Sequence, residues 1–248
     1  NQINEDIIFK KYLNRFYQPQ YHGVSAVNQS NIYLGEGVKI APTVFLDASN
    51  GPIILDNNVQ IMSQSSIIGP CYIGENTLVK IGAKIYPFNA IGQWCKVGGE
   101  IENTIIQSFS NKQHEGFLGH SYICEWVNLG ADTNNSDLKN TYGNIKMRLP
   151  HKTVDSGRMF LGLMCGDHTK SAINTQFNTG TVAGIGAILF DTGFLSTTIS
   201  SFCWGGAKNL KKYTFDDAIQ TAKIVMSRRK KELTDEEILL MQQEYSKW

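Results

Sequence analysis

The stretch "LDNNVQIMSQSSIIGPCYIGENTLVKIGAKIYPFNAIGQWCKV", residues 55–97, decides the fold of this chain. Every sixth residue in it is aliphatic: Leu55, Ile61, Ile67, Ile73, Val79, Ile85, Ile91 and Val97. A period of six is neither the 3.6 of an α-helix nor the simple alternation of a strand. It is typical of a parallel β-helix, in which short strands form stacked coils and one aliphatic side chain per strand points inward. The sequence predicts an all-β fold, a left-handed parallel β-helix with C-terminal α-helices.

The same interval continues on both sides of this stretch. It occurs at Leu34, Ile40 and Leu46, shifts by three near "ASNGP" at residues 48–52, and returns at Phe117, Ile123 and Leu129. We therefore expect the β-helix to occupy residues 31–200. Residues 1–30 are expected to form a linker that includes a helical segment at 4–17, and residues 201–248 a C-terminal extension.

The C-terminal extension carries two helix-start signals. Thr214 and Asp217 have the spacing of a capping box, with aspartate in place of glutamate, and Thr234 and Glu237 have the same spacing. These signals predict helices at roughly 215–231 and 235–246.

The repeat is interrupted after Val97, through "GGEIENTIIQSFSNKQHEG" at residues 98–116. Insertions in solenoids project as loops, usually on the binding face, so we expect an inserted loop at about 99–116. Within or beside it lies His114, with Glu100, Lys112 and Glu115 close in sequence. An imidazole can accept a proton near neutral pH, which makes His114 a candidate general base. His120 lies inside the resumed repeat, where we expect a structural role at a coil corner.

Composition excludes several classes of function. The 248 residues include 23 basic and 22 acidic side chains, a formal charge of +1, so no general field favours nucleic acid or an anionic membrane. There is no run of 18 apolar residues. The five cysteines are widely spread and form no C-x-x-C motif, which indicates reduced thiols in a cytoplasmic protein, with no disulfide framework and no zinc knuckle.

The stretch "QHEGFLGHSYICEWVNLGADT", residues 113–133, resembles the acetyltransferase half of the bifunctional N-acetylglucosamine-1-phosphate uridyltransferase/glucosamine-1-phosphate acetyltransferase family. More similar still are sugar-1-phosphate nucleotidyltransferases that carry a C-terminal left-handed β-helix. The motifs shared with that group are "VGGE" (97–100), "NKQHEGFLG" (111–119), "EWVNLGADTNNSDLKN" (125–140), "GDHTK" (166–170) and "INTQFNTGTV" (173–182).

The resemblance implies an N-acyltransferase that uses acetyl-CoA as co-substrate and acts on an amino-sugar phosphate or a nucleotide-sugar. It implies that His114 is the general base and that Asn128 binds the sugar phosphate. Ala131 is expected where backbone groups approach the acyl-CoA. Asp137 stands where the family has an asparagine that positions the acetyl group or orients the histidine, and Phe117 stands where the family has a sugar-binding tyrosine.

Further contacts are expected around this site. Glu100 and Lys112 are candidate substrate contacts, and a backbone N–H or side-chain amide near Ala131 or Asn135 could stabilise the oxyanion. Lys208, Lys211 and Arg228 are candidate partners for the CoA phosphates. The resemblance also implies a homotrimer, with the pantetheine arm between neighbouring copies, and no metal in this domain. The G-x-G-T-x-[ML]-x-P loop of the nucleotidyltransferase half does not occur here. We expect that half, and any Mg²⁺, only upstream of Asn1.

Three other interpretations stay open. Glu102 stands about where the family has a phosphate-binding lysine and Phe117 lacks the tyrosine hydroxyl, which would fit a non-catalytic trimeric scaffold. His114, His120 and His168 could supply three imidazoles to a metal, as in γ-type carbonic anhydrases. Cys165 with His168 could form a nucleophilic pair, although a core cysteine is the commoner outcome.

Overall fold

The computed structural model describes residues 21–149, 151–206 and 209–247. The chain divides into two compact units, unit 1 ending at Phe117 and unit 2 beginning at Leu118. The helix predicted at 4–17 lies outside the described residues.

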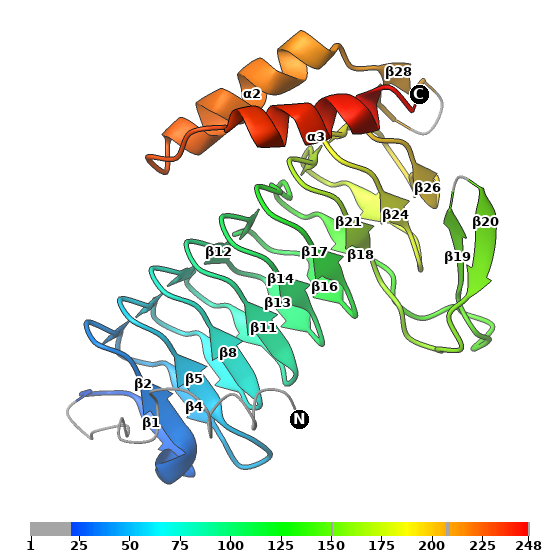
Figure 1. The fold of residues 1–248 in the computed structure, drawn as a ribbon. Helices are drawn as coiled ribbons and strands as arrows, with labels where there is room; N and C mark the ends of the chain where they lie inside the picture. The colour runs from blue at the N-terminus through cyan, green and yellow to red at the C-terminus, as the bar shows by residue number, and fades with distance from the viewer. Residues whose placement is uncertain (1–20, 150, 207–208, 248) are drawn as a thin grey trace. The chain divides into compact units, whose positions relative to one another are not determined.

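Unit 1 is a stack of triangular coils, whose parallel strands follow one another in Figure 1 from β1 onward. The first face holds β1 (Ser25–Val27), β4 (Phe45–Asp47), β7 (Ser66–Ile68), β10 (Lys84–Ile85) and β13 (Glu100–Glu102). The second holds β2 (Ile32–Leu34), β5 (Ile53–Leu55), β8 (Cys71–Ile73), β11 (Asn89–Ile91) and β14 (Ile105–Ile106). The third holds β3 (Lys39–Ile40), β6 (Gln60–Ile61), β9 (Leu78–Val79), β12 (Lys96–Val97) and β15 (Asn111–Lys112). A short 3₁₀ helix, η1 (Gln29–Asn31), links β1 to β2.

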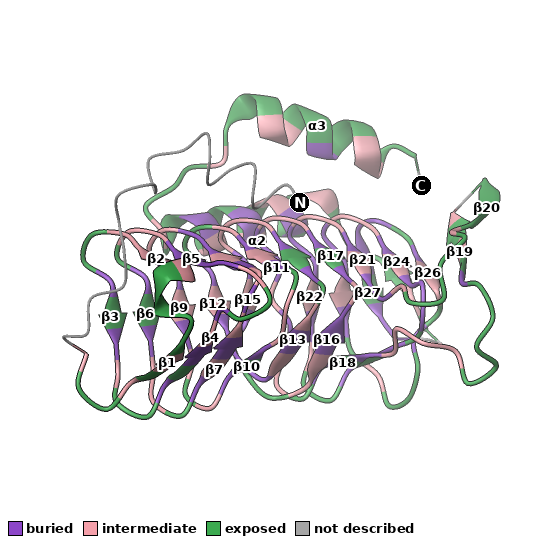
Figure 2. Ribbon diagram, turned by 90° about the horizontal axis from the view of Figure 1, so that it is seen from below, coloured by how far each residue is buried: buried purple, intermediate pink, exposed green. Residues whose placement is uncertain are grey.

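The inward positions of these strands are the positions of the six-residue repeat. Leu46, Ile67 and Ile85 are in register on the first face and are fully buried, and Figure 2 colours such strand residues as buried. Burial of each side chain of this size contributes about 1.5–3 kcal/mol. The predicted left-handed parallel β-helix is confirmed. Its first strand, β1, already lies inside the segment predicted as a linker.

The inserted loop predicted at about 99–116 is wrong, because this segment contains β13, β14 and β15. Val97 is in register with Val79, eighteen residues earlier, and with Lys112, fifteen residues later. The repeat therefore loses its phase because one coil is three residues shorter. The shift of the repeat near residues 48–52 arises because one coil is three residues longer. Ile40 pairs there with Ile61, twenty-one residues later.

Unit 2 contains coils of the same kind. One face holds β17 (Tyr122–Ile123), β21 (Met164–Cys165), β24 (Val182–Ala183) and β26 (Thr198–Ile199). A second holds β22 (Lys170–Ser171), β25 (Ile188–Leu189) and β27 (Cys203–Gly205), and a third β18 (Asn134–Asn135) and β23 (Gln176–Phe177). The strand β16 (Phe117–Gly119) begins on the last residue of unit 1.

The coils of unit 2 are interrupted by a projecting segment, residues 138–160, which we call the side hairpin. Its strands β19 (Lys146–Leu149) and β20 (Lys152–Asp155) pair antiparallel and project from the coils in Figure 1. Its base is closed by a bridge between Leu138 and Phe160 and by a hydrogen bond from Leu161 N to Asp137 O of 2.9 Å. The projecting segment that interrupts the coils is thus residues 138–160, and not residues 99–116 as predicted.

The chain ends in two helices, α2 (Phe215–Ser227) and α3 (Asp235–Tyr245), after β28 (Lys211–Lys212) has paired antiparallel with β27. The predicted helices are confirmed, and α3 has a complete capping box between Thr234 and Glu237. Met241 of α3 and Ala218 of α2 pack with Phe202 of the coils. In the part of the chain that the structure describes, no helix combines the length and the apolar character needed to cross a membrane.

Candidate functional site

In unit 1 the candidate general base His114 lies at the coil corner that follows β15, and its side chain is exposed. Lys112 supports this corner from inside. Its side chain is only 1% exposed, and Nζ donates hydrogen bonds to the carbonyl oxygens of His114 at 2.5 Å and Glu115 at 3.1 Å. A lysine enclosed in this way is bound to the main chain, so the predicted substrate contact of Lys112 does not fit the structure.

Glu100 lies beside the same corner. Its backbone N donates to Gly116 O at 3.1 Å, and its side chain is half-buried. The preceding Gly99 has φ +71°, and a Cβ there would lie 2.7 Å from His114 O and 2.8 Å from Gly116 O. Only glycine permits this approach. Three predicted site residues, Glu100, Lys112 and His114, are thus brought together in unit 1, and the roles of Glu100 and His114 stay predictions.

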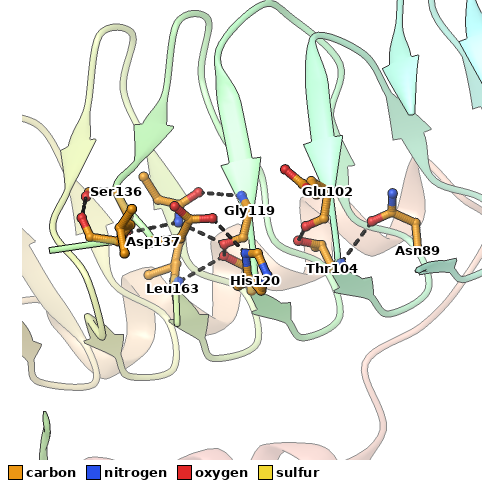
Figure 3. A network of polar contacts seen from close by, with 11 residues as sticks. Asn89, Glu102, Thr104, Gly119, His120, Ser136, Asp137 and Leu163 are labelled. Atoms are coloured by element: carbon orange, nitrogen blue, oxygen red, sulfur yellow. Dashed lines mark hydrogen bonds and ion pairs between the residues drawn. The ribbon is translucent and has the colours of Figure 1, made fainter. Parts of the chain in front are cut away.

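The remaining predicted residues of unit 1 lie elsewhere on it. Figure 3 shows Glu102, whose carbonyl oxygen accepts a hydrogen bond of 2.8 Å from Thr104 Oγ1. The Thr104 backbone N donates to Oδ1 of the fully buried Asn89 at 2.9 Å, so this network stabilises a corner. Phe117, the first residue of β16, is half-buried, and its contact with a sugar stays a prediction.

In unit 2 the structure pairs Asp137 with His120, which the sequence analysis left as a structural residue. Asp137 Oδ2 lies 2.7 Å from His120 Nδ1, and Figure 3 shows the two side chains facing each other. The imidazole also stacks on Phe160 of the side hairpin, with ring centroids 5.0 Å apart and planes at 26°. A histidine, a carboxylate and an aromatic ring therefore meet at the base of the side hairpin.

Coil geometry explains this pairing. Leu118 and Asn135 are both buried, and the side-chain amide of Asn135 bonds to the backbone N and O of Gly119, the residue after Leu118. His120 and Asp137 each follow two residues later, which places both at the same corner of successive coils. His120 and Asp137 each lie two residues after a buried residue, and this equal spacing could have predicted the pair from the sequence. The prediction would have required the register of the two coils, which the sequence alone does not give.

Asn135 itself is buried, and its amide serves the fold. Oδ1 accepts a hydrogen bond from Gly119 N at 2.8 Å, and Nδ2 donates to Gly119 O at 3.0 Å and Ser136 O at 3.3 Å. A buried amide with both ends engaged stabilises the interior. The side-chain amide of Asn135 is therefore engaged within the fold, and an oxyanion contact from a backbone N–H near Ala131 or Asn135 stays a prediction.

Asn128 and Ala131 lie on a different face of unit 2 from the His120–Asp137 pair. Asn128 forms a parallel bridge with Lys170, and its side chain is half-exposed. Ala131 O accepts a hydrogen bond of 2.7 Å from Asn174 N at the corner that follows. Their contacts with substrate and acyl-CoA stay predictions, and Lys208 lies outside the described residues.

A surface hollow of about 630 Å³ opens in the later coils of unit 2. Its lining includes Ile173, Phe190, Asp191, Trp204 and Lys211. Ile173 is 66% exposed, and the Phe190 and Trp204 rings meet edge to face at 5.5 Å. Its volume lies in the range of small-molecule sites, and its lining combines aromatic and charged groups.

The rival chemistry at His168 and Cys165 is disfavoured by burial. Burial and Lys170 lower the pKa of His168 to about 4, so this imidazole is neutral and enclosed. Burial raises the pKa of the Cys165 thiol strongly, which leaves little thiolate for nucleophilic attack. Among the described residues no three histidine, cysteine, aspartate or glutamate side chains are grouped to hold a metal ion.

The stacked coils define the class of fold, a left-handed parallel β-helix. No family model matches the chain. Among known proteins, it is 29% identical over 142 residues to a bifunctional sugar-1-phosphate nucleotidylyltransferase/acetyltransferase of Sulfurisphaera tokodaii, a match that covers 56% of this chain and 35% of that protein. It is 27% identical over 182 residues to the bifunctional protein GlmU of Thermodesulfovibrio yellowstonii, covering 63% of this chain and 36% of that protein.

These matches confirm the resemblance indicated by the motifs, and they cover the C-terminal part of the relatives. The chain spans little more than a third of the length of either relative. Among solved structures, the UDP-N-acetylglucosamine acyltransferase of Francisella novicida is similar with a TM-score of 0.45 and 13% identity, covering 92% of this chain and 83% of that one.

Proposed function

We propose that this chain transfers an acetyl group from acetyl-CoA to the amino group of an amino-sugar phosphate or a nucleotide-sugar. The observation that carries the proposal is the sequence match to relatives named as nucleotidylyltransferase/acetyltransferases, found in a chain that folds into the coils of a left-handed β-helix. The motif around His114 and Asn128 supports the same activity.

The reaction requires little from the protein. The amine lone pair attacks the thioester carbonyl carbon, a base removes a proton from the nitrogen, and the C–S bond breaks as the CoA thiolate leaves and takes up a proton. Alignment of the two substrates and proton removal supply most of the acceleration. The motif resemblance assigns the proton to an imidazole, His114.

The coenzyme has a candidate location in unit 2. Ala131 and Ile173 occupy corresponding corners of successive coils, because Asn174 N bonds to Ala131 O, and Ile173 lines the hollow. Lys211 in that lining, and Lys208 close to it in sequence, could contact phosphates. In this proposal the pantetheine arm lies along the coils between copies of a homotrimer.

The test is release of the CoA thiol from acetyl-CoA, measured with a thiol reagent over a panel of amino-sugar 1-phosphates and nucleotide-linked amino sugars. Mass spectrometry should show one acceptor gaining an acetyl group. Thiol release no faster than hydrolysis across the panel, together with no heat of acetyl-CoA binding in calorimetry, would reject the proposal and favour the non-catalytic scaffold.

A further inference from the structure

We propose that the side hairpin of one copy of this chain docks on the strand β13 of a second copy, where two of its cations pair with two carboxylates. Glu100 of β13 lies beside the corner that carries His114, because its backbone N bonds to Gly116 O. A docked hairpin would therefore complete that site from a neighbouring copy. The contact itself does not depend on the activity, but this consequence for catalysis rests on the proposed function.

The side hairpin is positively charged, unlike the rest of the chain. Residues 138–160 contain five basic side chains and one acidic side chain, whereas the remaining residues contain 18 basic and 21 acidic ones. The basic residues of the hairpin are Lys139, Lys146, Arg148, Lys152 and Arg158. A positive element on an otherwise slightly negative molecule is attracted to the body of a second copy.

The hairpin is a fixed element of unit 2. Ile145, the residue before β19, is fully buried, its N donates to Arg158 O at 2.9 Å, and its O accepts from Ser156 N at 3.1 Å. Thr198 Oγ1 of β26 donates to Arg148 O at 2.7 Å. The backbone that carries the cations is thus already held in position, so little ordering is needed when a partner binds to it.

Strand alternation places two cations on one side of β19. Lys146 and Arg148 are exposed, whereas Met147 between them is half-buried. Across the described residues of the chain, neither cationic side chain makes a hydrogen bond or an ion pair. Asp155 of β20 lies opposite Lys146, but its Oδ1 accepts from Gly157 N at 2.9 Å. Both cations are available to a partner.

Strand β13 of unit 1 presents a pair of carboxylates. Glu100 and Glu102 flank the fully buried Ile101, so both side chains lie on the outer surface of the coils. Lys84 is in register with Glu100, but its Nζ pairs with Glu115 at 3.2 Å. Among the residues that the structure describes, neither carboxylate of β13 has a hydrogen bond or an ion pair.

The two pairs match in sign and in separation. Residues two apart on a strand point to the same side and lie about 6.6 Å from each other. The two cations of β19 can therefore each meet one carboxylate when β19 of one copy lies along β13 of another. Neither pair is satisfied within one chain, which assigns the contact to a second copy.

These ion pairs position the hairpin, while apolar burial holds the copies together. Exposed ion pairs contribute little to affinity, but they select the register in which two surfaces meet. The proposal therefore predicts a specific contact between copies, and its test must detect that contact directly.

Carbodiimide coupling detects the contact with the native side chains. The reagent carries off one carboxylate oxygen as its urea and leaves an amide between the carboxyl carbon and a touching lysine Nζ, with no linker. Unlabelled and heavy-nitrogen-labelled chains are mixed until native mass spectrometry shows mixed assemblies, then coupled and digested. We expect amides from Lys146 to Glu100 or Glu102, including peptides that join one light and one heavy chain. The exposed Lys39 of β3 should form no amide with either glutamate.

Charge reversal provides the second arm. Lys146→Glu with Arg148→Glu should abolish the amide and lower kcat/KM about tenfold or more, because like charges then face each other. Glu100→Lys with Glu102→Lys should abolish the amide as well. All four substitutions together should restore coupling between the same two strands. The control Lys39→Glu should keep both the coupling and kcat/KM, and circular dichroism checks that every variant folds.

The outcomes separate this contact from the proposed function. Light–heavy amides in a chain that acetylates no acceptor would support the contact and reject the function. An active chain without these amides, or with amides only inside chains of one label, would overturn the contact alone. Folded double reversals that still couple, a fourfold reversal that does not, or a chain that stays monomeric would also overturn it.

Discussion

Lys112 takes an inward position that holds an aliphatic residue in the preceding coils. Lys112 is in register with Val97, and Val97 is in register with Val79. The polar end of the Lys112 side chain nevertheless lies in the interior. The backbone carbonyls of His114 and Glu115 satisfy it. A buried cation is tolerated only when such acceptors surround it. The fold thus uses one lysine to fix the corner that carries His114.

Replacement of Lys112 by Met should therefore destabilise the chain. The aliphatic stem is preserved, but the partly buried carbonyls of His114 and Glu115 lose their donor, which costs about 1–3 kcal/mol. Urea unfolding followed by circular dichroism measures this difference. The matched control is Lys84→Met, because Lys84 is exposed and pairs with Glu115 at 3.2 Å on the surface, where an ion pair contributes at most about 1 kcal/mol. Equal losses in the two variants would contradict the structural role of Lys112.

At the scale of elements, coil length and helix packing decide which side chains are enclosed. The turns of unit 1 vary from twenty-one to fifteen residues between partners in register, yet their strands stay paired. In unit 2, α2 and α3 pack against the coils and enclose His168 and Lys170 together with Tyr213, Ala218 and Met241. Lys170 Nζ donates to His168 O at 2.8 Å. A proton added to His168 would place a second cation under these helices.

The stability of the fold should consequently fall in acid through His168. Its pKa is lowered from 6.5 to about 4 in the folded state, so between these values the unfolded chain binds the proton more readily. The part of the free energy of unfolding that comes from keeping His168 unprotonated is fully present above pH 6.5 and is lost as the pH falls toward 4. The whole loss is about 3 kcal/mol.

The measurement is the free energy of unfolding at several pH values between 7 and 4, for wild type, His168→Leu and His151→Gln. His168→Leu should show a shallower decline than wild type, whatever its stability at pH 7. The exposed His151 should have no such influence, so its variant should follow the wild type. Parallel curves for all three proteins would refute the role of His168.

At the scale of the whole molecule, the coils enclose only one side of each strand. Several large apolar side chains remain exposed on the outer surface, including Phe88, Trp94 and Ile105 of unit 1 and Ile173 and Phe194 of unit 2. In the proposed homotrimer, apolar side chains of this kind would be covered by neighbouring copies. They support the proposed homotrimer, in which acyl-CoA would lie between copies.

Sedimentation equilibrium of the purified chain should give three times the 27.7 kDa of one chain. Because apolar burial drives such association, the mass should persist at moderate salt, where surface ion pairs are screened. A mass of one chain across the micromolar concentration range would contradict the trimer and remove the proposed position of the pantetheine arm.

Two local patterns determined most of the architecture. The six-residue aliphatic period specifies the β-helix because each strand must bury one side chain on the coil axis, and this requirement repeats along the chain. The spacing of Thr234 and Glu237 specifies the start of α3 because a helix N-terminus must satisfy its own free N–H groups. Both requirements are met by residues close in sequence.

Only the tertiary structure decided which segment projects and which residues meet. The loss of period after Val97 has the same appearance in sequence whether residues are inserted or removed, and the distinction comes from the register of Val97 with Lys112. His120 and Asp137 meet because successive coils bring their corners into alignment. Coil length and register depend on pairing between strands fifteen or more residues apart, so no short stretch of sequence contains them.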